Sequence, residues 1–146
     1  MEPVYDVPGI DMPVIAGHPG SQLRKLKGVD FEEVQKCVGN HDFLIVDVRG
    51  AQEIKDDGSI QGSVNIPFDE IASRFGEGAT ILSEKLGRKV AEDGSNLIFH
   101  CKMGGRATKA ALAADEFGFT KSRVYKGSLK DWIQNGGTVC KEFCPF

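Results

Sequence analysis

The sequence has no excess of positive charge and no long apolar run. Lys and Arg total 18 against 21 Asp and Glu, which gives a formal net charge of −3. Because the chain has no excess of basic residues to neutralise a phosphate backbone, we expect no nucleic-acid partner. No apolar segment approaches the roughly 20 residues that a membrane-spanning helix needs, so we expect no membrane partner.

Targeting signals are missing as well. The amino-terminal residues carry Glu2, Asp6 and Asp11. They show neither the apolar core of a secretory signal nor the arginine-rich, acid-poor composition of a transit peptide. We therefore predict a cytoplasmic protein, with a mitochondrial location as the less favoured alternative.

Metal-binding patterns are scarce. The cysteines form no Cys-x-x-Cys pair and the three histidines are scattered along the chain, so we predict no metal and no other cofactor. Without a secretory signal, reduced thiols are the default state. We interpret Cys140 and Cys144 as incidental tail thiols rather than as a resolving pair.

What is present indicates one soluble globular domain. The chain has 146 residues, of which 40% are hydrophobic and 27% charged, enough for one domain with a full core. Residues 1–22 hold four of the six prolines and predict an irregular lead-in, part of which is apolar enough to pack. Residues 23–146 form the predicted domain, including a short tail.

Short apolar runs alternate with amphipathic helical patterns along this domain. The predicted strands lie at 23–29, 43–48, 96–100 and 123–126, and the segment 58–67 predicts a turn and a short strand. The predicted helices lie at 31–38, 69–75, 80–90, 107–117 and 128–136. Such alternation predicts an α/β fold in three layers, with a mainly parallel sheet of about five strands and helices on both faces.

The first and the last of the predicted helices carry start signals. Asp30 with Glu33, and Ser128 with Asp131, have the spacing of capping boxes. Trp132, in the last helix, is expected to lie in the core.

The stretch from 97 to 106, LIFHCKMGGR, indicates a nucleophile. A buried strand ends at Cys101, a loop containing two glycines follows, and a helix opens near Arg106. Glycines permit the close backbone approach that a ring of amides around a sulfur atom needs. A thiol beside a helix N-terminus should ionise more readily than a free one. We therefore predict that Cys101 is a catalytic nucleophile.

Two polar residues follow another predicted strand. Asp47 and Arg49 end the apolar run that begins at Phe43. In open α/β sheets, ligands bind outside the carboxyl ends of the strands. This architecture places Asp47, Arg49 and Cys101 at the same edge.

Four segments, in order, resemble landmarks of the rhodanese family, particularly the small single-domain thiosulfate sulfurtransferases. They are Asp47-Val48-Arg49 with Glu53, the segment GSVNIP at 62–67, the loop 101–106, and the segment VYKGS at 124–128 with Trp132 and Gly136. The likeness covers roughly residues 26–139, and the set is far more specific than any single motif. Two positions depart from the family pattern. Ser59 stands where many members have histidine, and Ser128 stands where a second glycine is usual. The change at Ser128 is interpreted as tolerated variation.

The resemblance implies a rhodanese-like fold and a ping-pong sulfurtransferase that needs no cofactor. Cys101 would take a sulfane sulfur from thiosulfate or a similar donor, hold it as a persulfide, and pass it to cyanide or a thiol. The implied partners are thus a small-molecule donor and acceptor, with a thiol redox protein as a further acceptor.

The loop after Cys101 is predicted to bind the substrate and the persulfide. Positive charge would attract an anionic donor, backbone N–H groups would hold the sulfur, and a thioether would add polarizable surface. The residues concerned are Lys102, Met103, Gly104, Gly105 and Arg106.

The other polar residues near the loop are assigned supporting roles. Asp47 and Arg49 are expected to support the loop rather than to catalyse. Arg106 is expected both to brace the loop, through an ion pair with Asp47 or Glu53, and to attract the anion. His100 is interpreted as structural, because adjacent strand residues point to opposite faces.

Two other functions compete with this interpretation. A cysteine phosphatase or arsenate reductase of the same fold would have five residues between cysteine and arginine, whereas only four separate Cys101 from Arg106. The shorter loop suits a sulfur atom better than a tetrahedral phosphoryl group. A non-catalytic binding module remains the second alternative, because a fold does not by itself prove activity.

Overall fold

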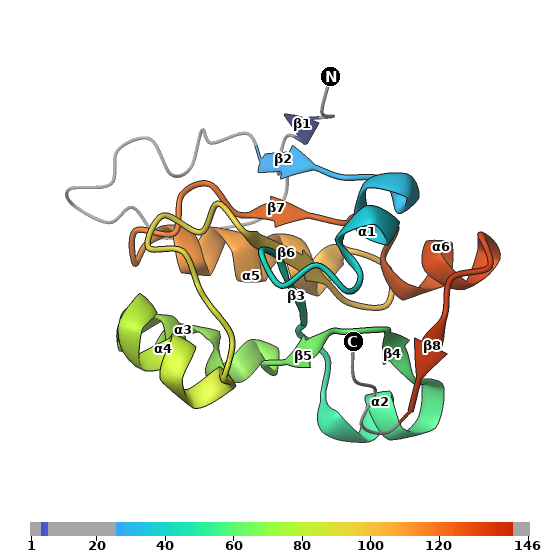
Figure 1. Ribbon diagram of the computed structural model, residues 1–146, viewed down its shortest axis with the longest axis horizontal. Coiled ribbons are helices and arrows are strands. Elements are labelled where there is room, and N and C mark those ends of the chain that lie inside the picture. The colour runs from blue at the N-terminus through green and yellow to red at the C-terminus, as the bar shows by residue number, and fades with distance from the viewer. Residues whose placement is uncertain (1–3, 6–25, 142–146) are drawn as a thin grey trace.

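A six-stranded sheet forms the centre of the molecule (Figure 1). The computed structural model describes residues 4–5 and 26–141. Five strands, in the order β2-β7-β6-β3-β5, run parallel, and β1 pairs antiparallel with β2 at one edge. The strands are β1 (Val4–Tyr5), β2 (Leu26–Gly28), β3 (Leu44–Asp47), β5 (Val64–Asn65), β6 (Leu97–His100) and β7 (Arg123–Val124). The predicted parallel sheet of about five strands is confirmed.

The amino-terminal prediction is only partly covered. Within the predicted lead-in of residues 1–22, only Val4–Tyr5 lies inside the described residues, and it forms β1. The rest of that segment lies outside the described residues, so the predicted domain boundary stays a prediction.

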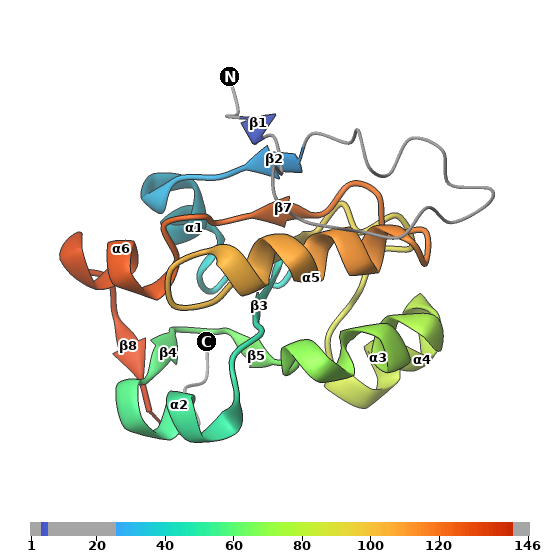
Figure 2. The same ribbon diagram turned by 180° about the vertical axis from the view of Figure 1, so that it is seen from behind.

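Helices cover both faces of the sheet, as predicted. Figures 1 and 2 show α1 and α5 on opposite faces. The helices are α1 (Phe31–Cys37), α2 (Ala51–Asp57), the 3-10 turn η2 (Phe68–Glu70), α3 (Ile71–Gly76), α4 (Ala79–Leu86), α5 (Gly105–Asp115) and α6 (Ser128–Gln134). A separate two-stranded sheet pairs β4 (Ser59–Ile60) with β8 (Val139–Cys140).

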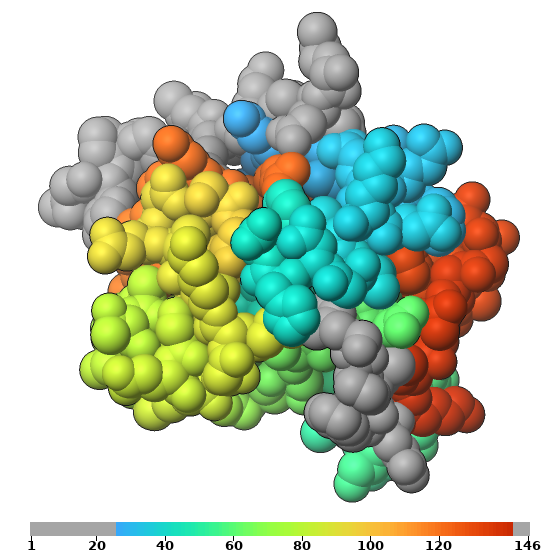
Figure 3. Space-filling view, viewed as in Figure 1, coloured from blue at the N-terminus to red at the C-terminus, as the bar shows by residue number. Residues whose placement is uncertain are grey.

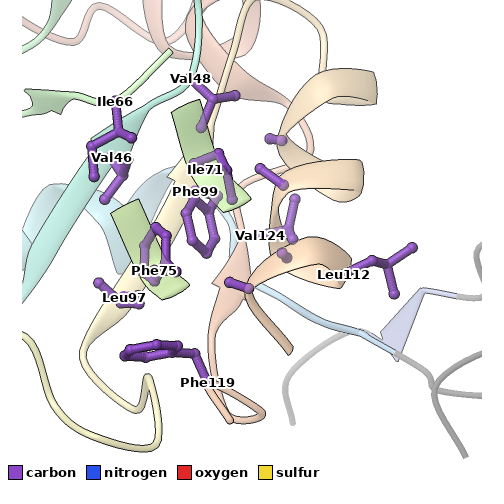
Figure 4. Packing of buried hydrophobic residues seen from close by; sticks show 14 of the residues in the cluster. Val46, Val48, Ile66, Ile71, Phe75, Leu97, Phe99, Leu112, Phe119 and Val124 are labelled. Atoms are coloured by element: carbon purple, nitrogen blue, oxygen red, sulfur yellow. The ribbon is translucent and has the colours of Figure 1, made fainter. Parts of the chain in front are cut away.

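The larger core lies between the sheet and α3, α4 and α5 (Figure 4). Phe75 from α3 packs against Phe99 of β6 and Phe119, with ring centroids 5.8 and 4.9 Å apart. The α5 residues that meet this core are mostly alanines. Their small side chains let the helix lie close to β6, which carries the candidate nucleophile at its end.

The smaller core lies on the other face, under α1 and α6. Ile45 and Ile98 point to this side and meet Val34, Leu129 and Trp132. The space-filling view shows α1 and α6 next to each other on this face (Figure 3). The predicted assignment of Trp132 to the core is confirmed, since its side chain is buried and Nε1 donates to the carbonyl of Thr138 at 2.9 Å.

The helix start predicted at Asp30 is confirmed. Its carboxylate accepts from the backbone N–H of Glu33 at 2.9 Å, and the Glu33 carboxylate accepts from the N–H of Asp30 at 3.3 Å. This reciprocal capping box fixes where α1 begins.

Two other helix boundaries differ from the sequence prediction. The helix expected at 107–117 ends at Asp115, so Phe117 lies outside it with 43% of its surface exposed. The helix expected at 80–90 is capped by Gly78 and ends at Leu86. Gly87, which takes the left-handed backbone conformation that glycine adopts easily, stops it.

Within residues 4–5 and 26–141, no helix is long and apolar enough to cross a membrane.

Candidate active site

Cys101 is the first residue after β6, and α5 begins four residues later. Its thiol is buried, and the backbone N–H of Gly104 points at Sγ at 3.0 Å. Gly104 has φ +104°, and a Cβ there would lie 2.3 Å from the carbonyl oxygen of Lys126. Only glycine fits at this position. The predicted cysteine, glycine loop and helix therefore come together around the sulfur.

Ser128 completes the surroundings of the sulfur, although sequence reasoning assigned it a different role. The sequence pattern predicts that it opens a helix as a capping box with Asp131. Instead its hydroxyl donates to the carbonyl of Tyr125 at 2.7 Å, accepts from the N–H of Cys101 at 3.1 Å, and lies 3.9 Å from Sγ. The capping box does not form, because the loop at Cys101 uses the Ser128 hydroxyl and the Tyr125 hydroxyl donates to the Asp131 carboxylate at 2.5 Å.

Arg106 lies in the first turn of α5 and pairs with Glu53 of α2. Its two terminal nitrogens donate to the two carboxylate oxygens at 2.7 and 3.1 Å. This resolves the two predicted partners in favour of Glu53. The hydrogen bond from Arg106 holds the pKa of Glu53 below its ordinary value and raises the pKa of Arg106. The charge of Cys101 adds to that rise, so Arg106 lies within the electrostatic reach of the sulfur.

The remaining loop residues face outward. The side chains of Lys102 and Met103 are 57% and 65% exposed, and Gly105 is exposed as well. Lys102 Nζ lies 4.0 Å from the Asp57 carboxylate. The loop thus presents a cation and an apolar thioether to solvent beside the buried thiol.

Asp47 and Arg49 form a buried ion pair one strand away from Cys101. The guanidinium donates to the carboxylate at 2.8 Å and to the Gly58 carbonyl at 2.5 Å. Ser59 Oγ donates to Asp47 at 2.6 Å. Asp47 and Arg49 hold the chain after α2, and among the described residues their side chains make no hydrogen bond to the loop at 101–106.

The electrostatics of this pair follow from burial and its neighbours. Burial alone would raise the pKa of the Asp47 carboxyl. The field of His100 and the hydrogen bonds from Arg49 and Ser59 outweigh it, so the pKa lies below its ordinary value. Burial lowers the pKa of His100, against the opposing charge of Asp47.

His100 is fully buried, and its Nε2 lies 2.9 Å from Ser63 Oγ. This contact ties the end of β6 to the turn before β5. Its position agrees with the predicted structural role.

Two expectations about ligands and thiols can be compared with the structure. Among the described residues, no group of three or more His, Cys, Asp and Glu side chains is placed to hold a metal ion. Cys140 is disulfide-bonded, which differs from the expectation of incidental, reduced tail thiols. Cys37 and Cys101 are free.

The site joins a buried thiol, an inward-pointing amide and a helix N-terminus. The first N–H groups of α5 have no intrahelical acceptor. They lie at the end of the loop that begins at Cys101. A cradle of this kind stabilises negative charge on sulfur. No side chain that could act as a general base contacts Sγ in the described part of the chain. The arrangement suits nucleophilic attack by a thiolate on an electrophile that leaves a sulfur anion behind.

The family follows from comparison with known proteins. Residues 30–135 match the family model described as "Rhodanese-like domain". This span covers most of the chain and contains the whole candidate site. The chain belongs to the rhodanese-like domain family.

Curated relatives carry sulfurtransferase names. The chain is 33% identical over 107 residues to the mouse thiosulfate sulfurtransferase/rhodanese-like domain-containing protein 3, covering 73% of this chain and 68% of the mouse protein. It is 29% identical over 117 residues to the thiosulfate:glutathione sulfurtransferase of Saccharomyces cerevisiae, covering 79% and 84%.

Solved structures agree with the fold. The human single-domain sulfurtransferase TSTD1 superposes with a TM-score of 0.65 at 26% identity, covering 75% of this chain and 97% of the human one. The S. cerevisiae single-domain sulfurtransferase RDL2 gives a TM-score of 0.64 at 28% identity, covering 78% and 94%. These likenesses support the general sulfurtransferase activity of the family.

Proposed function

We propose that this protein is a thiosulfate sulfurtransferase that works through a persulfide on Cys101. The observation that carries the proposal is the contact between Sγ of Cys101 and the N–H of Gly104, 3.0 Å apart, in a four-residue loop that leads into α5. A negative sulfur held in this way is both a good nucleophile and a stabilised product.

The first half-reaction loads the sulfur. The Cys101 thiolate attacks the outer sulfur of thiosulfate, a new S–S bond forms, and the bond to the sulfonate sulfur breaks. Sulfite leaves with the bonding electron pair, and Cys101 carries a persulfide anion. The total charge is unchanged, and no external oxidant or reductant is required.

The residues around the loop support this step. The N–H of Gly104 and the N-terminus of α5 supply positive ends of dipoles, which stabilise the persulfide anion. Lys102 and Arg106 add positive charge that attracts the thiosulfate dianion. Met103, next to them, offers a polarizable surface to sulfur.

The position of Arg106 disfavours a phosphatase. A phosphoryl group needs a guanidinium whose paired N–H groups can grip two of its oxygens. Here both terminal nitrogens of Arg106 bond to Glu53. Together with the loop of four intervening residues, this argues for a site that binds a single sulfur atom.

The second half-reaction unloads the sulfur to cyanide or a thiol. The acceptor attacks the outer sulfur and Cys101 leaves as a thiolate, ready for the next donor. Two relatives, from S. cerevisiae and human, are named thiosulfate:glutathione sulfurtransferases, which makes a small thiol our preferred acceptor over a thiol redox protein. A cytoplasmic location remains a prediction, and two relatives are named as mitochondrial.

The proposal is tested by replacing the nucleophile. We expect Cys101→Ser to abolish thiocyanate production from thiosulfate and cyanide while the far-ultraviolet circular dichroism spectrum is unchanged, because the hydroxyl cannot form a persulfide. Cys37→Ser, at the other free thiol of the described residues, is the matched control and should retain activity. Full activity in Cys101→Ser would move the nucleophile elsewhere.

A further inference from the structure

A pocket of about 300 Å³ opens beside the loop that holds Cys101. This volume lies at the lower end of the range for small-molecule sites, roughly 300–1,000 Å³. Its lining combines two cations, one carboxylate, one amide and two aliphatic side chains: Lys102, Lys130, Asp57, Gln134, Leu129 and Ile133. Its composition therefore favours an anionic ligand with an aliphatic part.

The pocket is tied to the candidate nucleophile through the backbone. The N–H of Leu129 donates to the carbonyl of Cys101 at 3.0 Å, and the N–H of Lys130 donates to the carbonyl of Lys102 at 3.1 Å. The first turn of α6 thus forms a pocket wall that is bonded directly to the loop of the site. Figures 1 and 2 show α6 at the end of the molecule toward which the arrows of β2 and β7 point. A ligand held here lies next to Lys102 and to the backbone of the loop that begins at Cys101.

The Asp57 carboxylate of the pocket is near two cations but hydrogen-bonded to neither. The Asp57 carboxylate lies 4.0 Å from Lys102 Nζ and 3.9 Å from Arg49 NH1. Both distances exceed those of a hydrogen bond. Arg49 is fully buried, and its NH1 has no hydrogen-bond partner among the described residues. The Asp57 carboxylate can therefore move to Arg49 NH1. The Lys102 ammonium is then available to pair with an incoming anion.

We propose that this pocket is the subsite for the sulfur acceptor and that it binds a small thiol bearing carboxylate groups, for which glutathione is the probe. Lys102 and Lys130 pair with the carboxylates, and Leu129 and Ile133 contact the aliphatic part. As the acceptor reaches Lys102, Asp57 moves onto Arg49 NH1 and satisfies this buried donor. The inference rests on the proposed function, because it takes Cys101 as the sulfur carrier.

The transfer step balances in the bound complex. The thiolate of the acceptor attacks the outer persulfide sulfur and forms a new S–S bond. The bond from that sulfur to Sγ of Cys101 breaks, and Cys101 leaves with the electron pair as a thiolate. The acceptor departs as a persulfide anion, and the charge of the complex is conserved.

Binding is tested without turnover, using S-methylglutathione, which keeps the charges of glutathione but cannot accept sulfur. Isothermal titration calorimetry of the wild-type protein should show one site. Lys130→Glu should weaken binding about tenfold, because it replaces an attraction by a repulsion. Lys89→Glu makes the same charge change at an exposed lysine before β6 and should bind as the wild type does. No binding to the wild type, or equal losses in both variants, overturns the proposal.

Steady-state kinetics give a second test, in which two variants change the same ratio in opposite directions. We compare kcat/KM for glutathione with kcat/KM for 2-mercaptoethanol, which is a thiol without carboxylates. Lys130→Glu should lower this ratio about tenfold. Asp57→Asn should raise it about twofold, because Lys102 loses a competing carboxylate. An unchanged ratio in both variants overturns the proposal, as does a protein thiol serving as the sole acceptor.

The two proposals fail in distinguishable ways. If Cys101 forms a persulfide with thiosulfate but glutathione never takes the sulfur, the acceptor subsite is wrong and the sulfurtransferase stands. If S-methylglutathione binds in a Lys130-dependent manner but no persulfide forms, the pocket binds thiols and the proposed function is wrong.

Discussion

Ser128 adopts a backbone conformation that serine rarely takes, with φ of +56°. The left-handed region costs an L-residue roughly 1–2 kcal/mol, whereas glycine enters it freely. The cost is offset by hydrogen bonds, because the buried hydroxyl joins the N–H of Cys101 to the carbonyl of Tyr125. At this residue a strained backbone keeps a polar group beside the sulfur.

Two substitutions separate the strain from the hydroxyl. Ser128→Ala and Ser128→Gly both remove the hydroxyl, but only glycine also relieves the backbone. We expect the Ala variant to lose about 1–3 kcal/mol in urea unfolding through unpaired buried groups. The Gly variant should be more stable than the Ala variant by about 1 kcal/mol. An Ala variant at least as stable as the Gly variant would contradict this account of φ.

At the scale of elements, the buried pair of Asp47 and Arg49 joins three segments. Asp47 ends β3, the Gly58 carbonyl that Arg49 binds closes α2, and Ser59, which donates to Asp47, begins β4. Both charged side chains are fully buried. Removing one partner leaves an uncompensated charge in the interior.

Asp47→Asn should therefore cost about 3 kcal/mol of unfolding free energy at pH 7, measured by denaturant titration. The pKa of Asp47 is lowered in the folded protein. Its contribution is thus complete above the unfolded-state pKa of about 3.9 and is lost as the pH falls through the folded-state value. The gap between wild type and variant should shrink below about pH 4. A gap that stays constant into acid would refute this assignment.

Sequence patterns predicted the elements better than their ends and contacts. The apolar run at 43–48 and the capping box at Asp30 are local signals, and β3 and α1 follow them. The role of Ser128 could not be predicted, because it depends on Cys101, which lies 27 residues away in sequence. The departure from the usual glycine at this position was the only signal in the sequence, and it was interpreted as tolerated variation.

The contacts that support the site likewise join residues that are far apart in sequence. The motif of Asp47 and Arg49 indicated its place at the sheet edge, and the sequence offered both Asp47 and Glu53 as partners of Arg106. Only the folded structure, which brings the Glu53 side chain of α2 within hydrogen-bond distance of Arg106, selects Glu53. Ser59 donates its hydroxyl to Asp47, a contact that depends on the turn between α2 and β4.

At the scale of the whole molecule, charge is unevenly distributed. The chain carries a net charge of −3, yet four cations belong to the loop and its surroundings: Lys102, Arg106, Lys126 and Lys130. They outnumber the two carboxylates that lie beside Arg106 and Lys102, those of Glu53 and Asp57. A local positive field can steer a dianion to a protein whose overall charge is negative.

This field predicts a salt dependence. Raising NaCl from about 20 to 200 mM should lower kcat/KM for thiosulfate about threefold, because the Debye length shortens. Lys102→Gln should flatten this dependence, while Lys89→Gln, away from the loop, should leave the slope unchanged. A rate that is independent of salt in the wild type would contradict electrostatic steering.

The central claim is that Cys101 carries the sulfur, and mass spectrometry after incubation with thiosulfate tests it most directly. We predict that the intact protein gains the mass of one sulfur atom, that the peptide containing Cys101 carries it, and that an excess of cyanide removes it. No gain in mass, or a sulfur found only on peptides containing Cys37 or the tail cysteines, would contradict the account.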